Sequence, residues 1–595
     1  MTGKSWQRIT LIFVAMVAWI SGLDLPVRAQ GTDPSWQLAL AYFFRNRFQA
    51  GVDYVFTYGP LGYFLPTESY DPHLYWLKYI WEIAIKAVFV AVLWKICESF
   101  PRFRDRLLLL LVAALFPPLL PPLHDTLYIA FLFAGSLCLS GFAFGMLCSL
   151  LALTKFNLLL LGFFLTALVA IHRRSFAVII AFAGTWIGLW LALGQSLTNI
   201  PLYLSRSWEI AGGYGAAMAL PGPPFEIGLA LVVVVLLADA SRLSPWHVVV
   251  ALGGATFFSF KHAFVRHDVY HAPGFFVFAA LAFGTLPARR WLQTSGIVLS
   301  LLAVVLYRGS AESARLLVDH WAGQAVALVR PVTWEKILDR EYINIENRFA
   351  LPQICRKIGT GSVDVMGLLA DQRIAILNNL RWHPRPVFEG YSAYTPQLLD
   401  INARFYQGSQ APEFVIVAWR GLGLDLRLPA ANDGAALLEL VARYEPVEGE
   451  KRLFRRSVTP DQQTATSESV KEIQMGERLE VGPSEVARFE INYSLLGKIR
   501  NFFYKPAFAL VLLTLDSGEV RIYRCVPAIV ASKFLLTPLI ENLDDIVGLY
   551  SPGEKKIVTG LEVFADKTWF QPKVKVTLSN FALPECPPPP ESRSE

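Results

Sequence analysis

The first 307 residues of the chain contain long apolar runs that carry almost no charge. In residues 126–171, for example, Lys155 is the only formal charge. A bilayer core takes about 20 apolar residues per helix, and a backbone in lipid must satisfy its own hydrogen bonds. Residues 308–595 lack such runs and read as an ordinary water-soluble sequence. The chain is therefore predicted to be a polytopic α-helical membrane protein followed by a soluble C-terminal region.

Composition narrows the range of partners. Only 17% of the residues are charged, below the roughly 25% typical of soluble domains. The net charge of +6 is modest and no Lys/Arg-rich tract is present, so we expect no nucleic-acid partner. The six cysteines form no CxxC pair, and no zinc or haem spacing occurs. The expected partner of the apolar half is the lipid bilayer.

Eleven spans fit the apolar pattern if the N-terminus is cytoplasmic. The stretch 126–171 allows two long helices or three short ones. With three, the basic segments 101–106, 172–174, 241–242 and 288–290 all fall in the cytoplasm, whereas two helices move the last three outside. We therefore predict spans near 9–23, 76–97, 107–122, 126–140, 142–154, 157–171, 176–194, 225–239, 246–260, 272–287 and 291–307.

This topology predicts a multi-pass protein of the plasma (inner) membrane with an extracytoplasmic C-terminal half. The first apolar run, Ile9 to Gly22, also has features of a cleaved signal peptide, because "PVRAQG" follows it. An uncleaved first span is the preferred interpretation, since many further spans follow it.

The outer connector 261–271, "KHAFVRHDVYH", is unusually rich in charge. Its cations lie on the face where the positive-inside rule disfavours them, which indicates a binding role for anionic groups at the lipid boundary. The alternative is that the side chains snorkel and anchor two helix ends. A third interpretation is a metal bound by the histidines and the carboxylate, if the segment is helical. The candidate substrate-binding residues here are Lys261, Arg266, His267, Asp268 and His271.

The first outer loop, 24–75, begins with a strong helix start. Asp33 suits the N-cap and Pro34 the first helical position of "DPSWQLALAYFFRNRF", which we expect to lie as an amphipathic helix on the membrane surface. An extended segment follows, "VDYVFTYGPLGYF", with Asp53 and Tyr58 as further candidate substrate-binding residues.

An acidic residue after the first span, a juxtamembrane helix and an aromatic "F-x-Y-G-P-L" segment before the second span resemble the GT-C superfamily of membrane glycosyltransferases. That superfamily includes protein O-mannosyltransferases and aminoarabinose transferases. The resemblance covers the topology of the whole chain but has sharp motifs only in the first 70 residues. It implies a GT-C-like fold, in which Asp33 matches the acidic residue of the first loop. No Asp-x-Asp pair is present in this loop, so no cofactor is expected and a divalent metal is not favoured.

The chemistry of such a transfer accounts for these residue types. A base must activate the acceptor hydroxyl, and the Asp33 carboxylate can serve. Cations must stabilise the leaving phosphate; Lys261, Arg266, Lys155 and Arg206 are candidates. The outer segment 203–218 adds Glu209 and Tyr214 beside a glycine cluster. In the structural alternative, Asp33 is only a helix cap, Lys155 snorkels, and 203–218 is a turn between spans.

The C-terminal half divides into two predicted domains. Residues 308–460 mix helix and strand patterns, as expected of an α/β domain, with a non-periodic, ligand-binding type of loop at 381–406. A polar linker at 457–474 leads to alternating strands with a hairpin at Ser517-Gly518, as in a β-sandwich. The predicted domains are 1–307, 308–460 and 475–585.

Together these features predict a hexosyl or pentosyl transferase of the cell envelope. It would move a sugar from a polyprenyl-phosphate donor to a glycan, lipid or protein acceptor at the outer face. Two alternatives stay open: a transporter or flippase of lipid-linked saccharides, and a non-catalytic glycan-binding envelope protein. A transporter would place essential charges near the middle of the bilayer, whereas a transferase would place them at the outer helix ends.

Overall fold

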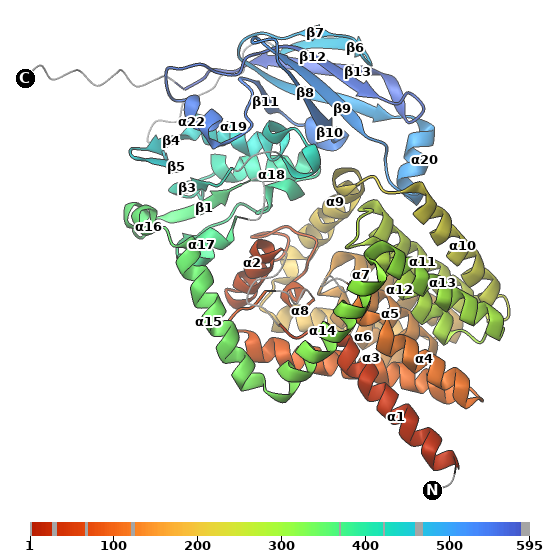
Figure 1. The fold of residues 1–595 in the computed structure, drawn as a ribbon. Helices are drawn as coiled ribbons and strands as arrows, with labels where there is room; N and C mark the ends of the chain where they lie inside the picture. The colour runs from red at the N-terminus through yellow and green to blue at the C-terminus, as the bar shows by residue number, and fades with distance from the viewer. Residues whose placement is uncertain are drawn as a thin grey trace, which may run out of the picture. The chain divides into compact units, whose positions relative to one another are not determined.

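The computed structural model of the chain describes residues 3–26, 33–65, 69–120, 125–367, 371–419, 423–457 and 468–584 (Figure 1). The chain forms two compact units. Unit 1 comprises 1–47, 57–198 and 220–345, and unit 2 comprises 48–56, 199–219 and 346–595. Unit 1 is helical, whereas all the named strands described lie in unit 2.

A helix lies at each of the predicted spans of unit 1. The stretch 126–171 forms three helices, because the chain breaks at Ser140, whose Oγ accepts from the N–H of Ala143 at 3.3 Å, and again at Lys155. The helices are α1 (Gly3–Gly22), α3 (Tyr75–Ser99), α4 (Phe103–Leu115), α5 (Asp125–Cys138), α6 (Gly141–Ala152), α7 (Phe156–Arg173), α8 (Ala177–Ala192), α10 (Pro224–Ser241), α11 (Trp246–Val265), α12 (Ala272–Thr285) and α13 (Arg290–Arg308).

Within the described ranges, four helices are long and apolar enough to cross a membrane: α7, α10, α11 and α13. A fifth is added if α8 and its bent continuation are counted as one span. Helices α5, α6 and α12 are apolar but shorter. Unit 1 is thus a bundle with several membrane-compatible helices, and the count of eleven spans stays a prediction.

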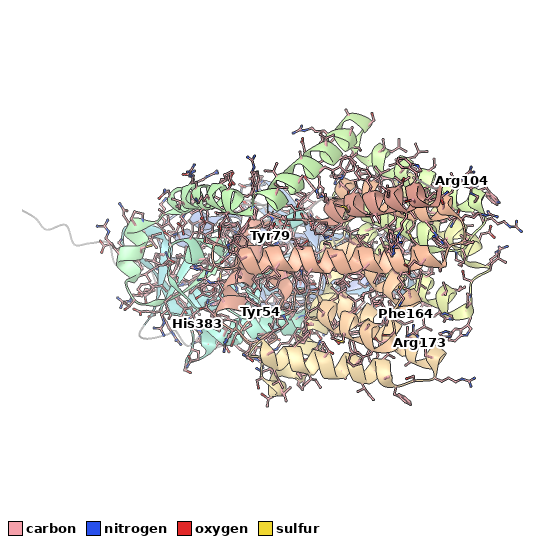
Figure 2. The ribbon with its side chains drawn as sticks, turned by 90° about the horizontal axis from the view of Figure 1, so that it is seen from below. Tyr54, Tyr79, Arg104, Phe164, Arg173 and His383 are labelled. Carbon is pink, nitrogen blue, oxygen red and sulfur yellow. The ribbon has the colours of Figure 1, made fainter. Side chains whose placement is uncertain are left out.

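The predicted cytoplasmic connectors gather at one end of unit 1. Arg290 Nε lies 3.9 Å from Asp105 Oδ1, which joins the connectors 286–290 and 101–106. The rings of His172 and His247 stack with centroids 3.5 Å apart. Figure 2 shows Arg104, at the start of α4, and Arg173, at the end of α7, toward the same end of these helices. Connectors that the topology assigns to one face therefore meet in space.

Two expectations about the helices of unit 1 are corrected. The charged segment 261–271 is not wholly a connector, because α11 continues to Val265 and carries its first five residues. Helix α2 (Pro34–Arg45) begins where the sequence predicts, but it does not expose a polar face, because even Ser35 and Gln37 are buried. A helix lying on a membrane surface exposes its polar side chains to water, whereas α2 buries polar and apolar side chains alike.

A third correction concerns 203–218, which was expected to be a loop. The segment is part of α9 (Ile200–Met218) in unit 2. Gly213 lies where a Cβ would meet the Tyr394 Cβ at 2.4 Å, so the glycine permits close packing rather than a turn. The glycines of 203–218 predicted a break in the helix, but packing within unit 2 stabilises a continuous helix there.

The first sheet of unit 2 is mixed. Its strands are β1 (Ser362–Met366), β2 (Arg381–Trp382), β3 (Phe414–Val417), β4 (Tyr444–Val447) and β5 (Glu450–Arg456), in the order β2-β1-β3-β5-β4. Strands β2, β1 and β3 are parallel and β5 is antiparallel to β3. The accompanying helices are α16 (Pro352–Ile358), α17 (Arg373–Leu377), α18 (Pro396–Gln407) and α19 (Gly434–Arg443). The expected loop 381–406 is therefore in part the helix α18.

Two antiparallel four-stranded sheets complete unit 2. The first has the order β10 (Val520–Cys525), β9 (Ala509–Leu515), β12 (Val558–Ala565), β7 (Leu479–Glu480). The second has the order β11 (Phe534–Thr537), β8 (Glu485–Tyr493), β13 (Phe570–Asn580), β6 (Glu468–Gln474). Buried residues of both sheets, among them Phe489, Val511, Val563 and Val576, share one core. The predicted linker 457–474 is corrected at its C-terminal end, because residues 468–474 form strand β6.

The remaining described helices lie beside these elements in the chain. Helices α14 (Ser310–Val329) and most of α15 (Pro331–Phe349) group with unit 1, although the sequence assigned them to the soluble half. Short helices α20 (Leu495–Phe503), α21 (Pro527–Val530) and α22 (Leu543–Gly548) belong to unit 2. The finer domain boundaries at 307 and 460 stay a prediction.

Candidate functional site

Backbone pairing brings Tyr58 and Lys155 together. The N–H of Phe156 donates to the Thr57 carbonyl at 3.1 Å, and the N–H of Gly59 donates to the Thr154 carbonyl at 3.0 Å. The aromatic segment after α2 thus pairs with the break between α6 and α7. Lys155 Nζ lies 3.4 Å from the Tyr58 hydroxyl.

Asp125, the first residue of α5, contacts a lysine and a histidine from other elements of unit 1. Its Oδ2 forms an ion pair with Lys155 Nζ and lies 3.5 Å from His262 Nε2. The Asp125 side chain is 1% exposed, so removing its partner would leave a buried charge uncompensated, at a cost of about 3–5 kcal/mol. Three elements distant in sequence are therefore tied at this point.

The turn between α11 and α12 is organised by Asp268. Its Oδ1 accepts from the backbone N–H of Tyr270 at 2.9 Å and of His271 at 3.0 Å, and lies 2.8 Å from His271 Nδ1. Its Oδ2 lies 3.1 Å from Arg266 Nε. Burial raises the pKa of the Asp268 carboxyl, but His271 and Arg266 outweigh burial, so the pKa is lowered overall. Asp268 therefore holds the Arg266 and His271 side chains in place.

Asp33 interacts electrostatically with the same two side chains, Arg266 and His271. It lies immediately before α2, yet its side chain makes no capping hydrogen bond, contrary to the structural alternative that it is only a cap. Burial raises the pKa of Asp33, although a hydrogen bond from Trp36 and the charges of Arg266 and His271 act in the opposite direction. A carboxylate with a raised pKa beside cations is a more basic group than an exposed aspartate.

We call this set the acid–base cluster. The Trp36 ring stacks on the Tyr58 ring at a centroid distance of 4.8 Å and so connects the start of α2 to Lys155. The His262 and His271 rings lie 5.9 Å apart and connect Asp125 to Asp268. The cluster consists of Asp33, Tyr58, Asp125, Lys155, His262, Arg266, Asp268 and His271.

His267 is not brought into the acid–base cluster. Its Nε2 lies 2.5 Å from Glu226 Oε2 of α10 and 3.3 Å from the Tyr307 hydroxyl of α13. It therefore faces away from its sequence neighbours Asp268 and His271. No group of three or more His, Cys, Asp or Glu side chains in the described part of the chain is arranged to hold a metal ion.

The other predicted site residues have different surroundings. Lys261 is half-buried on α11, next to His262 in sequence. Arg206 lies on α9 in unit 2 and donates to the Gly51 carbonyl at 2.7 Å. Asp53 is exposed, and its Oδ2 accepts from the Gln49 N–H at 2.7 Å, which is a local turn contact.

Glu209 and Tyr214 are also on α9. Glu209 is half-buried, and the Tyr214 ring packs edge-on against Tyr394 with centroids 6.1 Å apart. These contacts are those of a helix packed within unit 2. A role of Glu209 and Tyr214 in substrate binding stays a prediction.

Sequence reasoning did not select Asp125 or His262 as site residues. The signal available for Asp125 was its position at the start of an apolar run, after a proline-rich sequence. A carboxylate in that position is typical of an ordinary connector between spans. It also missed the buried charges of α3, where Lys86 Nζ lies 3.7 Å from Glu82 Oε2 and the Lys78 Nζ lies 4.2 Å from the Tyr63 ring centroid.

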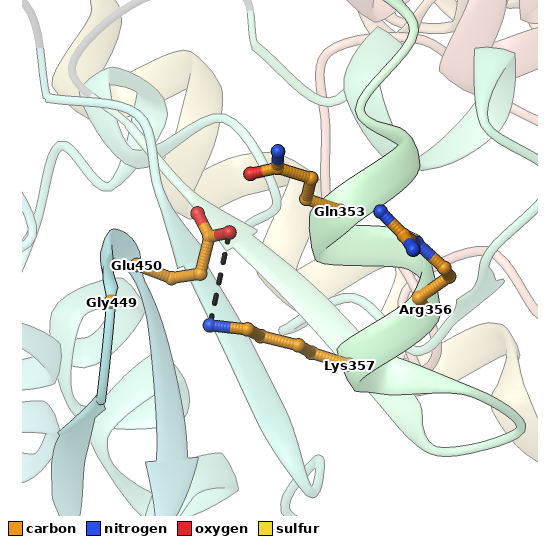
Figure 3. Close-up of a pocket in the computed structure, with 5 residues that line it drawn as sticks. All are labelled: Gln353, Arg356, Lys357, Gly449 and Glu450. Carbon is orange, nitrogen blue, oxygen red and sulfur yellow. Dashed lines mark ion pairs between the residues drawn. The ribbon is translucent and has the colours of Figure 1, made fainter.

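Unit 2 has a shallow pocket of about 390 Å³ (Figure 3). Gln353, Arg356 and Lys357 of α16 line it together with Gly449 and Glu450 of the β4–β5 turn. Lys357 Nζ lies 3.8 Å from Glu450 Oε1, and this pair holds the helix to the turn. The five lining residues include no nucleophile paired with a base, so we place the candidate site at the acid–base cluster.

No family model matches the sequence, and no curated protein matches it. Among solved structures, the chain is similar to arabinofuranosyltransferase AftD from Mycobacteria, with 11% sequence identity and a TM-score of 0.29. The alignment covers 97% of this chain and 58% of that chain, so this chain spans little more than half of the length of that protein. A likeness of this strength does not identify a function, and the proposal below rests on the acid–base cluster.

Proposed function

We propose that the protein is an integral membrane glycosyltransferase. It moves a sugar from a polyprenyl-phosphate donor to a glycan, lipid or protein acceptor at the extracytoplasmic face of the plasma membrane. The observation that carries the proposal is Asp33, a carboxylate with a raised pKa, beside Arg266 and His271. A group-transfer site needs this combination of a base and positive charge.

The residues have complementary roles in the transfer. Asp33 accepts the proton of the acceptor hydroxyl while the hydroxyl oxygen forms a bond to C1 of the sugar. The bond between C1 and the phosphate oxygen breaks, and its electron pair leaves with the polyprenyl phosphate. Arg266 and Lys261 bind the phosphate, whose negative charge grows during bond breakage. Asp268 positions Arg266 and His271 through the contacts at 3.1 and 2.8 Å.

The second carboxylate group has a positioning role. Asp125 holds Lys155 and His262 at the end of the helices where Asp33 lies, within unit 1. Because Asp125 is buried and ion-paired, it is poorly placed to take up a proton in each turnover. Asp33, half-buried and without a salt bridge among the described contacts, is the better base.

The proposal is tested by transfer from donors of defined structure. Purified protein in lipid nanodiscs is mixed with polyprenyl-phosphate hexoses and pentoses and with a membrane extract as acceptor source. We expect release of polyprenyl phosphate that depends on both acceptor and Asp33. Absence of release with every donor, from protein that is folded and inserted, would contradict the transferase function.

One observation favours the transporter alternative. Lys78, Glu82 and Lys86 are buried along α3, in a predicted span, where charged side chains are costly and often line a pathway. Lipid scrambling in liposomes separates the two functions. A transporter moves a fluorescent lipid-linked saccharide between leaflets without releasing polyprenyl phosphate. The proposed transferase releases polyprenyl phosphate without moving the saccharide between leaflets.

A further inference from the structure

Helix α20, Leu495–Phe503, divides its residues sharply by type. Its sequence is LLGKIRNFF, and it follows strand β8 in the sandwich part of unit 2 (blue in Figure 1). Ser494 caps its start, since Ser494 Oγ accepts from the Gly497 N–H at 3.0 Å. The helix is therefore fixed at its first turn by a strong local signal.

One face of α20 is seated on the sandwich. A Cβ at Gly497 would lie 2.1 Å from the Trp569 carbonyl oxygen, so only glycine allows this approach. Ser494 Oγ donates to the Thr568 carbonyl at 2.8 Å. The Arg500 guanidinium lies 4.6 Å from the Trp569 ring centroid. The orientation of the helix on its own unit is thus well defined.

The opposite face carries large apolar side chains that are exposed. They are Leu495 (75% exposed), Leu496 (56%), Ile499 (48%), Phe502 (63%) and Phe503 (61%). At 100° per residue these side chains cover an arc of about 120°, the width of the apolar stripe of an amphipathic helix. Soluble surfaces rarely leave so concentrated a patch uncovered.

The charges around this arc are all positive. On the same helical projection Lys498 lies about 40° beyond one edge of the arc and Arg500 about 40° beyond the other. No acidic residue occurs from 495 to 505. An apolar stripe with a cation on each flank complements a membrane surface, whose acyl region is apolar and whose headgroup phosphates are anionic.

We propose that α20 binds the surface of a bilayer that contains anionic phospholipid. The five apolar side chains enter the boundary between headgroups and acyl chains, and Lys498 contacts lipid phosphates, while Arg500 stays on the Trp569 ring. Removing large apolar side chains from water is favourable in proportion to the area buried, so even partial insertion favours the bound state. The same chain has helices that can cross a membrane, so the bilayer is the apolar partner at hand. This anchor is independent of the glycosyltransferase proposal.

The test uses the full chain in nanodiscs of phosphatidylcholine and phosphatidylglycerol. A nitroxide is attached at Ile499→Cys or Phe503→Cys, with Val470→Cys on β6 as the matched control, because Val470 is also apolar and is 55% exposed. The described native cysteines are buried or half-buried, and labelled wild-type protein gives their background. We expect positions 499 and 503 to be accessible to oxygen but to lose accessibility to a water-soluble nickel chelate. Position 470 keeps accessibility to the chelate.

Two results would overturn the proposal. Nickel accessibility at 499 and 503 equal to that at 470 would mean that the helix lies in water. Shielding from both reagents would mean that protein, not lipid, covers the helix. For the charge, Lys498→Glu should restore nickel accessibility in anionic nanodiscs and change little in purely zwitterionic ones; equal effects in both lipids would exclude recognition of anionic headgroups.

Discussion

Asp33 carries two opposing electrostatic effects. Burial disfavours its charged form, whereas Arg266, His271 and the hydrogen bond from Trp36 favour it, and burial is the larger effect. The net result is a carboxylate that holds a proton more strongly than an exposed aspartate, although Arg266 and His271 reduce the effect of burial. A raised pKa suits a general base, whereas it gives no advantage to a residue that only caps a helix.

We expect Asp33→Asn to be folded and inserted but to lose transfer by about 10²–10⁴-fold, the usual contribution of a positioned base. The amide has the same shape and cannot accept the proton. The measurement is release of polyprenyl phosphate by purified variant protein. Asp319→Asn is the matched control, because Asp319 is an exposed aspartate on α14 that pairs with the exposed Arg315. Wild-type turnover in Asp33→Asn would reduce Asp33 to a structural residue.

The pH dependence of kcat/KM provides a second check on Asp33. Because the base acts in its ionised form, the rate should rise with pH through an acid limb above the ordinary aspartate value of 3.8. Stability has the opposite sign: a carboxyl with a raised pKa in the folded state loses stabilisation as pH rises from its unfolded to its folded pKa. The pH profile of the residual activity of Asp33→Asn is compared with that of the wild-type protein. If both have the same acid limb, a group other than Asp33 causes it.

Part of the acid–base cluster was predictable because charge is expensive in apolar sequence. Lys155 was selected on that ground, and Arg266, Asp268 and His271 were selected because their connector departs from the positive-inside rule; the structure brings them together with Asp33 and Tyr58. Their partners Asp125 and His262 were not selected, because pairing across 30 residues (Asp125 with Lys155) or 137 residues (Asp125 with His262) leaves no local pattern. His267 was grouped with its neighbours in sequence, but the turn before α12 points it to Glu226 instead.

Among the elements, the least predictable was the ion network that orders the first sheet of unit 2. Arg385 Nη1 lies 2.8 Å from Asp364 Oδ2 of β1, and Arg385 Nε lies 2.7 Å from Asp433 Oδ2 at the start of α19. All three side chains are buried. The sequence showed Arg385 only as one basic residue in a loop rich in aromatics, which suggested ligand binding. The contacts indicate a structural role.

We therefore expect Arg385→Ala to destabilise unit 2 by about 3–5 kcal/mol, because two carboxylates would be left buried without their cation. Pulse proteolysis of the full chain, read as cleavage within 346–584, measures the effect. Arg381→Ala is the control, since Arg381 is exposed on strand β2, just before Arg385 in sequence. If both variants resist proteolysis equally, the network does not stabilise the sheet.

Periodicity located elements well where packing and local preference agree. The three helices α5, α6 and α7 follow from Ser140 as a cap and Lys155 as a break, and the β9–β10 turn follows from Ser517-Gly518. The prediction failed at α9, because Gly213 lies within the helix, where it allows Tyr394 and Thr395 to pack closely against the backbone. It also failed for the environment of α2, because apolar content alone does not distinguish a surface helix from a buried one.

For the whole molecule, the eleven-span topology predicts termini on opposite sides of the membrane, with the C-terminal half extracytoplasmic. The contacts at Asp105 and Arg290, and at His172 and His247, agree with this alternation within unit 1. An alkaline phosphatase fused after Glu595 should be active, and the same fusion after Arg242, in a predicted cytoplasmic connector, should be inactive. Activity in the opposite pattern would reverse the orientation and place the acid–base cluster in the cytoplasm.

The central claim is that Arg266 of the acid–base cluster, together with Lys261, which is next to His262 in sequence, binds the phosphate of a lipid-linked donor. It is measured most directly by the affinity of a short polyprenyl phosphate for wild-type protein, Lys261→Ala, Arg266→Ala and Arg266→Lys in nanodiscs. A charge-assisted contact contributes roughly 1.5–3 kcal/mol, so each alanine variant should bind about 10- to 150-fold more weakly. Arg266→Lys should recover only part of the affinity, because lysine lacks the bidentate fork. Unchanged affinity in both alanine variants would contradict the account.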